Sequence, residues 1–321
     1  MKTEDINISF YKAENGLGKI IVYESNISEF SLKNFILENK SIINKKLLEY
    51  GGILFRNFSV DSISEFNNLS KLLLNKQMEY MNRSTPRRSL GGKIYTATEY
   101  PSDRYIPFHN ENSYTLNWPQ TILFYCAVAA KEGGETPIAD SRNVYKHIDN
   151  KIVEKFNKYK VLYVRNYISG IDLPWQEVFQ TNKKDEVEEY CKNNKIGFKW
   201  GADKIELTTK QICQASVLHP QTKEPVWFNQ AHLFNSSRLE TDIFKKLVYE
   251  LGEGNITRES FYGNGDKIER KVLEYIKASY EKERIEFKWK RNDVLLLDNL
   301  LMSHSRNPFK GPRKIAVAMG S

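Results

Sequence analysis

A series of short apolar runs constrains the fold of this chain more than any other feature. From residue 94 onward, strand-like runs rich in Val, Ile, Tyr and Phe follow one another at irregular spacing. Many short strands of this kind are typical of a barrel or of two sheets packed as a jelly roll. The runs are IYTAT (94–98), TILFYCAV (121–128), YKVLYVRNY (159–167), IGFKW (196–200), KIELT (204–208), ASVLHP (215–220), PVWFN (225–229), IEFKW (285–289), DVLLLDN (293–299) and KIAVAM (314–319).

Helical patterns flank and interrupt these runs. Apolar residues recur at helical spacing over 30–50 and 60–76, and the second helix has a candidate N-cap in Asp61 or Ser62. Between them, GGILFRNF (51–58) indicates a buried strand that follows a glycine turn. Further helical insertions are predicted around 142–157, 184–194 and 240–282, the last interrupted near GEGN and YGNGD.

The chain shows no sign of division into parts. No internal repeat, low-complexity tract or Gly/Ser linker marks a boundary, so we expect one domain over residues 1–321. Strands do not alternate regularly with helices, and G-x-G-x-x-G and Walker sequences are absent from the sequence, which disfavours a nucleotide-binding α/β fold. The predicted class is therefore mainly β with flanking helices (α+β).

The composition predicts a soluble protein. No run approaches the ~18 apolar residues of a membrane helix, and the segment MKTEDINISFYK lacks the apolar stretch of a secretory signal. We therefore expect a cytoplasmic protein without a membrane partner. Cys126, Cys191 and Cys213 lie far apart and form no C-x-x-C pair, which predicts reduced, buried thiols rather than a disulfide or a zinc site.

The net charge of +8 allows two interpretations. One is an acidic partner, such as a nucleic acid or a negatively charged carrier protein. The other is a chain whose lysines are spread over solvated helix faces. We favour the second, because segments such as NKKDEVEEYCKNNK mix both signs. Nucleic-acid binding is therefore not expected, whereas an acidic carrier protein stays open as a partner.

Two histidines stand two positions before an acidic residue: His109 before Glu111, and His147 before Asp149. In an extended chain, residues i and i+2 point to the same side and can share one ion, whereas in an α-helix they lie ~200° apart. The second pair falls in SRNVYKHIDNKIVEKF, which has helical spacing, so we exclude it. His109 and Glu111 lie between YIPF and SYTL, an extended context, and can form half of a metal site.

A third ligand must come from elsewhere in the chain. His304 is the best candidate, because the apolar run DVLLLDN precedes it and an arginine-bearing strand follows it. Two imidazoles and one carboxylate form the facial triad that suits Fe(II) and leaves three positions open. On these residues alone, a structural role for the histidines remains the simpler alternative.

Longer motifs in a fixed order add to this pattern. The chain resembles the Fe(II)/2-oxoglutarate-dependent oxygenases of the TauD/TfdA family, in the branch that contains clavaminate synthase and the syringomycin-type aspartyl hydroxylases. The resemblance implies a double-stranded β-helix, that is, a jelly roll. It covers about residues 45–321 and rests on GGILFRNF, RSTPRRSLGGKIYTATEYP, IPFHNENSY, GGETPIADSR, LPWQEVFQT, LHPQTKEPVWFNQAHLF and LLLDNLLMSHSRNPFKGPRKIAVAM.

The resemblance implies roles for five residues. His109, Glu111 and His304 would bind iron. Arg313 would pair with the distal carboxylate of 2-oxoglutarate, a task that suits the planar, permanently charged guanidinium. Thr136 of GGETP would donate its hydroxyl to the same carboxylate; taken alone, it would be a turn hydroxyl. With O2 as the second co-substrate, these groups imply hydroxylation of an unactivated C–H bond, with succinate and CO2 as further products.

The sequence departs from the family pattern at two positions near the C-terminal end of the resemblance, and each bears on the predicted site. Lys314 stands beside Arg313, and we prefer Arg313 because it shares one strand face with Ile315 and Val317. Taurine dioxygenase carries a second arginine, which holds the sulfonate, at the position of Val317, so a taurine-like substrate is disfavoured. Related halogenases lack the carboxylate ligand, so Glu111 favours hydroxylation over halogenation.

Substrate contacts are expected from the segment upstream of the first metal ligand, which covers the substrate in this family. Arg83, Arg87 and Arg88 of NRSTPRRS could bind a carboxylate or a phosphate; the alternative is a solvated loop. The remaining polar candidates are Asn229 and Gln230 in VWFNQAH, and Arg306, which we expect to brace a carboxylate.

The expected function is hydroxylation of an amino acid, free or tethered to a peptidyl carrier protein, in the biosynthesis of a specialised metabolite. One alternative keeps the cofactors but gives desaturation or cyclisation, or takes a small substrate that is not an amino acid. Another is a non-catalytic jelly-roll binding protein. The sequence does not determine the oligomeric state, and a homo-oligomer is compatible with it.

Overall fold

An eight-stranded sheet forms the centre of the protein. The structure, a computed structural model, describes residues 5–27, 29–78, 87–97, 100–168, 170–201, 205–239, 241–252 and 255–321. The order of strands in the sheet is β1-β2-β3-β16-β7-β19-β5-β4. These strands are β1 (Ile6–Lys12), β2 (Lys19–Ser25), β3 (Gly52–Arg56), β16 (Val294–Asp298), β7 (Thr121–Val128), β19 (Lys314–Gly320), β5 (Ile94–Thr96) and β4 (Ser89–Gly91). The middle strands are apolar on both faces, as expected for a sheet that is covered on both sides.

A smaller sheet covers the inner face. It consists of β6 (Ile106–His109), β17 (Met302–Arg306) and β9 (Ile138–Asp140), in that order. Side chains alternate along each strand, so one set from the large sheet packs with Ile138 and Met302 of the small sheet in a single apolar cluster. Two facing sheets with a core between them form the double-stranded β-helix that the sequence predicted.

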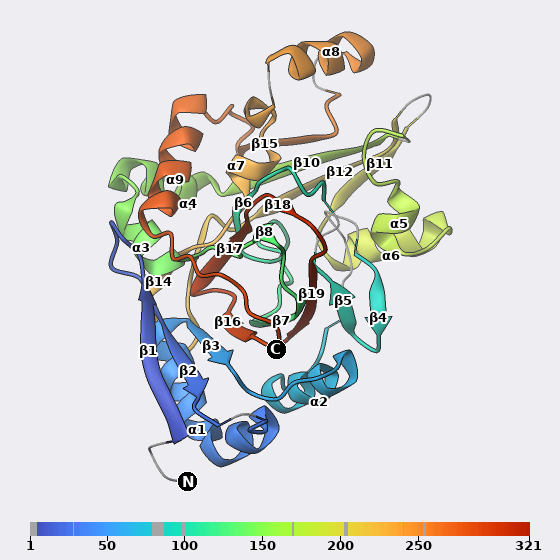
Figure 1. Ribbon diagram of the computed structural model, residues 1–321. Helices are drawn as coiled ribbons and strands as arrows, with labels where there is room; N and C mark the ends of the chain where they lie inside the picture. Colours follow the sequence, from blue (N-terminus) through green and yellow to red (C-terminus); the bar gives the residue numbers. More distant parts are fainter. Residues whose placement is uncertain are drawn as a thin grey trace.

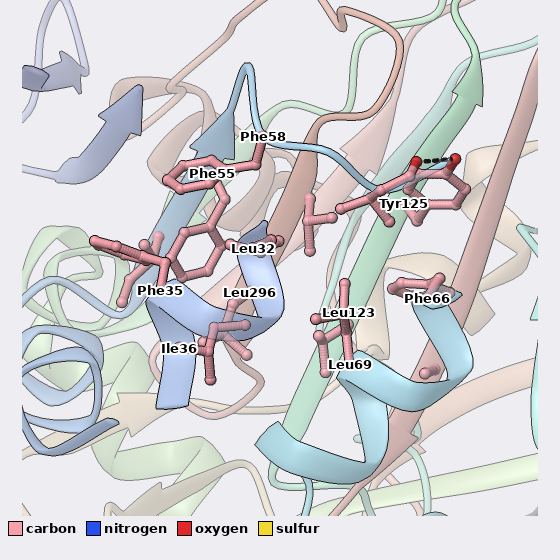
Figure 2. Packing of buried hydrophobic residues seen from close by; sticks show 14 of the residues in the cluster. Leu32, Phe35, Ile36, Phe55, Phe58, Phe66, Leu69, Leu123, Tyr125 and Leu296 are labelled. Carbon is pink, nitrogen blue, oxygen red and sulfur yellow. Dashed lines mark hydrogen bonds between the residues drawn. The ribbon is translucent and has the colours of Figure 1, made fainter. Parts of the chain in front are cut away.

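Two helices cover the outer face (Figure 1). They are α1 (Leu32–Tyr50) and α2 (Ile63–Leu73), and each begins after a serine whose side chain accepts an N–H of the first turn. For α2 this serine is Ser62, one of the two predicted caps. Figure 2 shows Phe35 of α1 and Phe66 of α2 packed against the alternate side chains of the large sheet. Burying each such aromatic side chain stabilises the fold by ~1.5–3 kcal/mol.

The remaining elements surround this core (Figure 1). A four-stranded sheet has the order β11 (Gly197–Trp200), β12 (Ile205–Cys213), β10 (Val161–Ile168) and β15 (Arg258–Tyr262). Two short pairs are β13 (Ser216–Leu218) with β14 (Pro225–Trp227), and β18 (Phe309–Lys310) with β8 (Glu132–Gly133). The helices are α3 (Ser141–His147), α4 (Asn150–Tyr159), α5 (Trp175–Phe179), α6 (Lys184–Asn193), α7 (Ala231–Phe234), α8 (Thr241–Leu251) and α9 (Arg270–Lys282), with a 3₁₀ turn at Ser236–Arg238.

Three sequence predictions need correction, and one pair of strands was missed. The helix expected at 142–157 is two helices, α3 and α4, and the segment 240–282 contains strand β15 between α8 and α9. The run IEFKW (285–289) is not a strand; within it, Ile285 forms only an isolated bridge with Ile138. The hairpin of β1 and β2 was not predicted, although Ile6, Ile8 and Phe10 alternate with polar residues along β1.

Other expectations have mixed outcomes. The three cysteines are free and buried, as predicted. Within the part of the chain that the structure describes, no helix is both long and apolar enough to cross a membrane. One domain over residues 1–321 stays a prediction.

Candidate active site

His109 and His304 face each other across two antiparallel strands. They are Cα partners in the pairing of β17 with β6, and their ring centroids lie 4.3 Å apart. The Nδ1 atom of His109 lies 2.8 Å from the carbonyl oxygen of Pro107, which can only accept a hydrogen bond, so Nδ1 carries the proton. The Nε2 lone pair of His109 is therefore left for a metal ion.

Glu111 joins the two histidines from the turn after β6. Its carboxylate and the two imidazoles each offer a ligand atom, and these atoms lie within 4.8 Å of one another. The physical reason differs from the predicted one: β6 ends at His109, and Asn112 has a left-handed φ of 56°. A tight turn, rather than one strand face, brings the carboxylate beside the rings. Among the described residues, this is the one group of its kind that could hold a metal ion.

Two buried asparagines hold this turn in place. Asn299 accepts the N–H of Glu111 at 2.7 Å and donates to the carbonyl oxygens of Glu111 and Pro119. Asn110 donates to the carbonyl oxygen of Asn299 at 2.7 Å. Neither asparagine was predicted from the sequence as part of the site. For Asn299, the available signal was its position between the apolar runs LLL and LLM, where a polar residue is buried only with a full set of partners.

Burial keeps both imidazoles neutral. It lowers the pKa of His109 and brings the pKa of His304 well below its usual range, because the charged rings would lose their hydration. At neutral pH both rings are therefore uncharged, which is the state in which imidazole binds a metal. Two neutral imidazoles and one carboxylate fit a divalent ion such as Fe(II).

Arg313 and Thr136 meet in the same cavity. The guanidinium donates from Nη2 to Thr136 Oγ1 at 3.3 Å and from Nε to the Gly134 carbonyl oxygen at 2.9 Å. Gly133 and Gly134 have φ values of 67° and 74°, and a Cβ atom on Gly134 would lie 3.0 Å from Arg313 Cδ, so the glycine turn makes room for the arginine. Burial, together with Arg306, lowers the pKa of Arg313 to about 10. The side chain remains charged at neutral pH and is suited to an anion.

Trp289 orients the Thr136 hydroxyl. The indole N–H donates to Thr136 Oγ1 at 3.0 Å, and Arg313 donates to the same oxygen. Since both lone pairs of this oxygen are used, the Thr136 O–H is left to donate to a ligand. From the sequence, Trp289 was predicted only to lie in the strand-like run IEFKW, without a role in the site.

One cavity between the two facing sheets joins these groups. Apolar side chains of β7 and β19 form its walls, and Ile315 and Val317 share a face with Arg313 as predicted. The complete lining is Arg87, Ala97, Ile106, His109, Phe124, Thr136, His304, Ser305, Arg306, Arg313, Ile315 and Val317.

The upstream arginines have different places. Arg83 lies outside the described residues. Arg87 lines the cavity and is buried, and its Nη2 lies 2.6 Å from Glu111 Oε2. Arg88 is exposed, and its backbone N–H donates to Thr96 Oγ1 at 2.9 Å. Of the two described arginines, Arg87 is thus the one that reaches the site.

Asn229 and Gln230 have main-chain partners. Asn229 donates to the Ala215 carbonyl oxygen at 2.7 Å and accepts the N–H of Ala231 at 3.0 Å. Gln230 donates to the carbonyl oxygen of Asn110 at 2.8 Å, which links it to the turn that holds Glu111. These bonds favour a structural role for both residues over the substrate contact that the sequence suggested.

Arg306 lines the cavity but also holds a loop. Its guanidinium donates to the carbonyl oxygens of Tyr100, Pro101 and Arg104, which precede β6. Three main-chain oxygens therefore take the place of the carboxylate that we expected Arg306 to brace.

His147 and Asp149 are not arranged as a metal pair, although the reason is not a continuous helix. The chain leaves the helical path after His147, and Asp149 caps α4 by accepting the N–H of Lys151 at 2.8 Å. His147 Nε2 instead lies 2.7 Å from Glu283 Oε1.

Comparison with known proteins agrees with this geometry. The family described as "Taurine catabolism dioxygenase TauD, TfdA family" matches residues 16–319. The chain is 39% identical over 305 residues to the dapdiamide synthesis protein DdaC of Enterobacter agglomerans, an alignment that covers 95% of this chain and 92% of that protein. It is 28% identical over 293 residues to a clavaminate synthase-like protein of Arabidopsis thaliana, an alignment that covers 88% of this chain and 86% of that protein.

Solved structures confirm the fold. PvcB, described as an Fe, alpha-ketoglutarate dependent oxygenase from an isonitrile synthetic pathway, superposes with a TM-score of 0.58 at 11% identity, over 99% of this chain and 92% of that one. AAD-2, crystallised with Mn(II) and N-oxalylglycine, gives a TM-score of 0.55 at 12% identity, over 98% and 97%.

Proposed function

The chain belongs to the taurine catabolism dioxygenase TauD, TfdA family, and from this membership we propose an Fe(II)- and 2-oxoglutarate-dependent dioxygenase that hydroxylates an unactivated C–H bond of an amino acid. The observation that carries the proposal is the meeting of His109 and His304, with Glu111 beside them, at the cavity that Arg313 and Thr136 also line. A metal triad alone suits many reactions. A triad beside a partly buried guanidinium suits the binding of an oxo acid that carries a second carboxylate.

In this proposal His109, His304 and Glu111 hold the metal and leave three positions for co-substrates. With O2 as the oxidant, bound iron and 2-oxoglutarate would supply the oxidation of the C–H bond: one oxygen atom would enter the product and the other succinate, with release of CO2. The protein's own contribution begins with the neutral imidazoles, which burial keeps ready to bind.

Arg313 and Thr136 would hold the distal carboxylate of 2-oxoglutarate. The guanidinium is already fixed by its bonds to Gly134 and Thr136, so little conformational freedom is lost on binding. Trp289 sets the Thr136 oxygen so that its O–H is directed to a ligand. A charged donor in a desolvated pocket binds a carboxylate more strongly than the same donor in water.

The apolar walls would position the substrate carbon. Phe124, Ile315 and Val317 line the cavity and offer no polar atom to compete with the metal ligands. Such walls exclude water and hold the reacting C–H bond in one place, which is the protein's main contribution to chemistry of this kind.

The substrate class is supported by the relatives. One is named a dapdiamide synthesis protein, and another is named clavaminate synthase-like. We therefore propose an amino acid, free or tethered to an acidic carrier protein, in specialised-metabolite biosynthesis. The net charge of +8 is compatible with such a carrier. Val317, at the position of the sulfonate-binding arginine of taurine dioxygenase, argues against a taurine-like substrate.

The test is a panel of amino acids, offered free and as carrier-protein thioesters, with Fe(II), 2-oxoglutarate and O2. Succinate release that depends on one substrate, together with a product one oxygen atom heavier, is the expected result. A product lighter by two hydrogens would indicate desaturation or cyclisation with the same cofactors. Succinate release that no member of the panel stimulates would contradict an amino-acid substrate.

A further inference from the structure

A buried ion pair joins the cavity wall to the carboxylate of the metal group. Arg87 Nη2 lies 2.6 Å from Glu111 Oε2, and the two side chains are 3% and 4% exposed. Charge-assisted hydrogen bonds of this length are among the strongest in proteins and restrict the geometry of both partners. The sequence suggested Arg87 as a substrate contact, but in the structure its described partner is a candidate metal ligand.

The backbone on each side of this pair is held by separate contacts. Next to Arg87, the N–H and the carbonyl oxygen of Arg88 both bond to Thr96 of β5, at 2.9 and 2.8 Å. On the other side, Asn299 holds both main-chain groups of Glu111. These contacts fix the main chain of Glu111, but they do not fix the rotation of its side-chain carboxylate. Among the described residues, Arg87 is the hydrogen-bond partner that orients the carboxylate.

A carboxylate can bind a metal through one oxygen or through both. If both oxygens of Glu111 bound, together with two imidazoles, an octahedral ion would keep two open positions instead of three. The two oxygens of a chelating oxo acid would then occupy both remaining positions. Arg87 donates to one of the two oxygens, Oε2, and a metal that binds through the other oxygen alone keeps this hydrogen bond intact.

We propose that Arg87 is a positioning residue that holds Glu111 as a single-oxygen ligand and so keeps a coordination position open for co-substrate binding. The inference rests on the proposed function, since it assumes a metal held by Glu111 and 2-oxoglutarate beside it. It assigns to Arg87 an action through Glu111 rather than a contact with the substrate.

The test measures the binding of 2-oxoglutarate by calorimetry to full-length protein saturated with Mn(II), in the absence of turnover. Arg87→Met keeps an unbranched side chain but releases Oε2, so its Kd for 2-oxoglutarate rises by ~10-fold or more, the range for partners that orient metal ligands. Arg87→Lys retains a charged donor, so its Kd for 2-oxoglutarate lies between the values of Arg87→Met and the wild type. The neighbouring arginine, Arg88, is exposed and provides the matched control. The Kd of Arg88→Met for 2-oxoglutarate stays within ~2-fold of the wild-type value.

A double-mutant cycle separates action through Glu111 from direct contact. In a Glu111→Ala background, Arg87→Met changes the Kd by ~2-fold or less, because there is no carboxylate left to position. An equal rise in both backgrounds would show that Arg87 contacts 2-oxoglutarate directly and would overturn the proposal. If Arg87→Met alone leaves the Kd for 2-oxoglutarate unchanged but raises the KM for the substrate, Arg87 contacts the substrate, and the proposal is wrong.

A spectroscopic readout covers the case in which Glu111→Ala binds no metal, and Arg87→Lys replaces Arg87→Met in it if the methionine variant fails to fold. The visible charge-transfer band of the Fe(II)–2-oxoglutarate complex shifts in Arg87→Met, and to a smaller extent in Arg87→Lys, even at saturating 2-oxoglutarate. An unchanged band in the folded variant would contradict the proposal. Wild-type protein that binds Mn(II) but no 2-oxoglutarate would instead overturn the proposed function, and this inference with it.

Discussion

His109 and His304 are direct cross-strand partners, and their ring centroids lie 4.3 Å apart on the inner sheet of the fold. His304 is buried and His109 is partly buried, both rings are neutral, and the Glu111 carboxylate approaches from the following turn. The site thus depends on the pairing of β6 with β17, which brings two distant parts of the chain together.

Removal of one ring tests this relationship. We expect His304→Ala to weaken Fe(II) or Mn(II) binding by more than ~100-fold, since even partners that only orient a ligand are worth 10–100-fold, while the far-ultraviolet circular dichroism stays unchanged. Calorimetry measures the affinity. His147→Gln is the control, because His147 bonds to Glu283 outside the metal group. An equal loss in both variants would argue against a specific site.

Substitution of two neighbouring cationic residues tests which of them binds 2-oxoglutarate. Arg313→Met removes a partly buried charged donor, each such hydrogen bond being worth ~1.5–3 kcal/mol, so the Kd for 2-oxoglutarate should rise by ~100-fold. Lys314→Met changes an exposed residue next to it and should alter the Kd by less than ~2-fold. A larger effect at Lys314 would mean that the assignment is displaced by one residue.

Asn299 should matter for both stability and metal binding. Asn299→Ala leaves main-chain groups of Glu111 and Pro119 buried without partners, which predicts a loss of ~2–4 kcal/mol in the free energy of unfolding. Urea denaturation of the metal-free protein measures this loss. Asn264→Ala, in an exposed turn, should change stability by less than ~0.5 kcal/mol. Equal effects in the two variants would show that Asn299 does not hold the turn.

The pH dependence of stability tests the burial of His232. Its Nε2 donates to the Phe108 carbonyl oxygen at 2.9 Å, and burial lowers its pKa to about 3. Below pH ~6.5, His232 binds a proton in the unfolded chain but not in the folded chain. The free energy of unfolding that is present above this pH is therefore lost as the pH falls. At pH 5 the loss from this residue is ~2 kcal/mol. His232→Gln, which keeps an N–H donor, should show a smaller loss between pH 7 and pH 5. Identical pH slopes for the two proteins would contradict this account.

The parts of the site that could be predicted share one property: their chemistry is visible in the local sequence. The spacing of His109 and Glu111, the arginine after His304 and the ordered motifs were sufficient to name the metal group. The backbone reason for Glu111 was still wrong, because a turn with a left-handed Asn112 takes the place of a continuing strand. Local spacing does not distinguish an extended strand from a turn that returns the side chain to the same side.

The residues that were missed act across long separations in sequence. Asn299 bonds to a turn that lies near position 111, and Trp289 bonds to Thr136 from a segment without regular strand pairing. The pairing of Arg87 with Glu111 likewise depends on how β5 lies beside the cavity. Such contacts follow from the tertiary arrangement of the two sheets, and the periodicity of a single sequence contains no information on them.

The central claim is that Fe(II) and 2-oxoglutarate bind together at His109, Glu111 and His304. The most direct measurement is an anaerobic titration of the metal-free protein with both, monitored through the visible metal-to-ligand charge-transfer band of the chelate. The account predicts a band in the wild type that is lost in His304→Ala and weakened in Arg313→Met. A folded wild-type protein that develops no band would contradict the account.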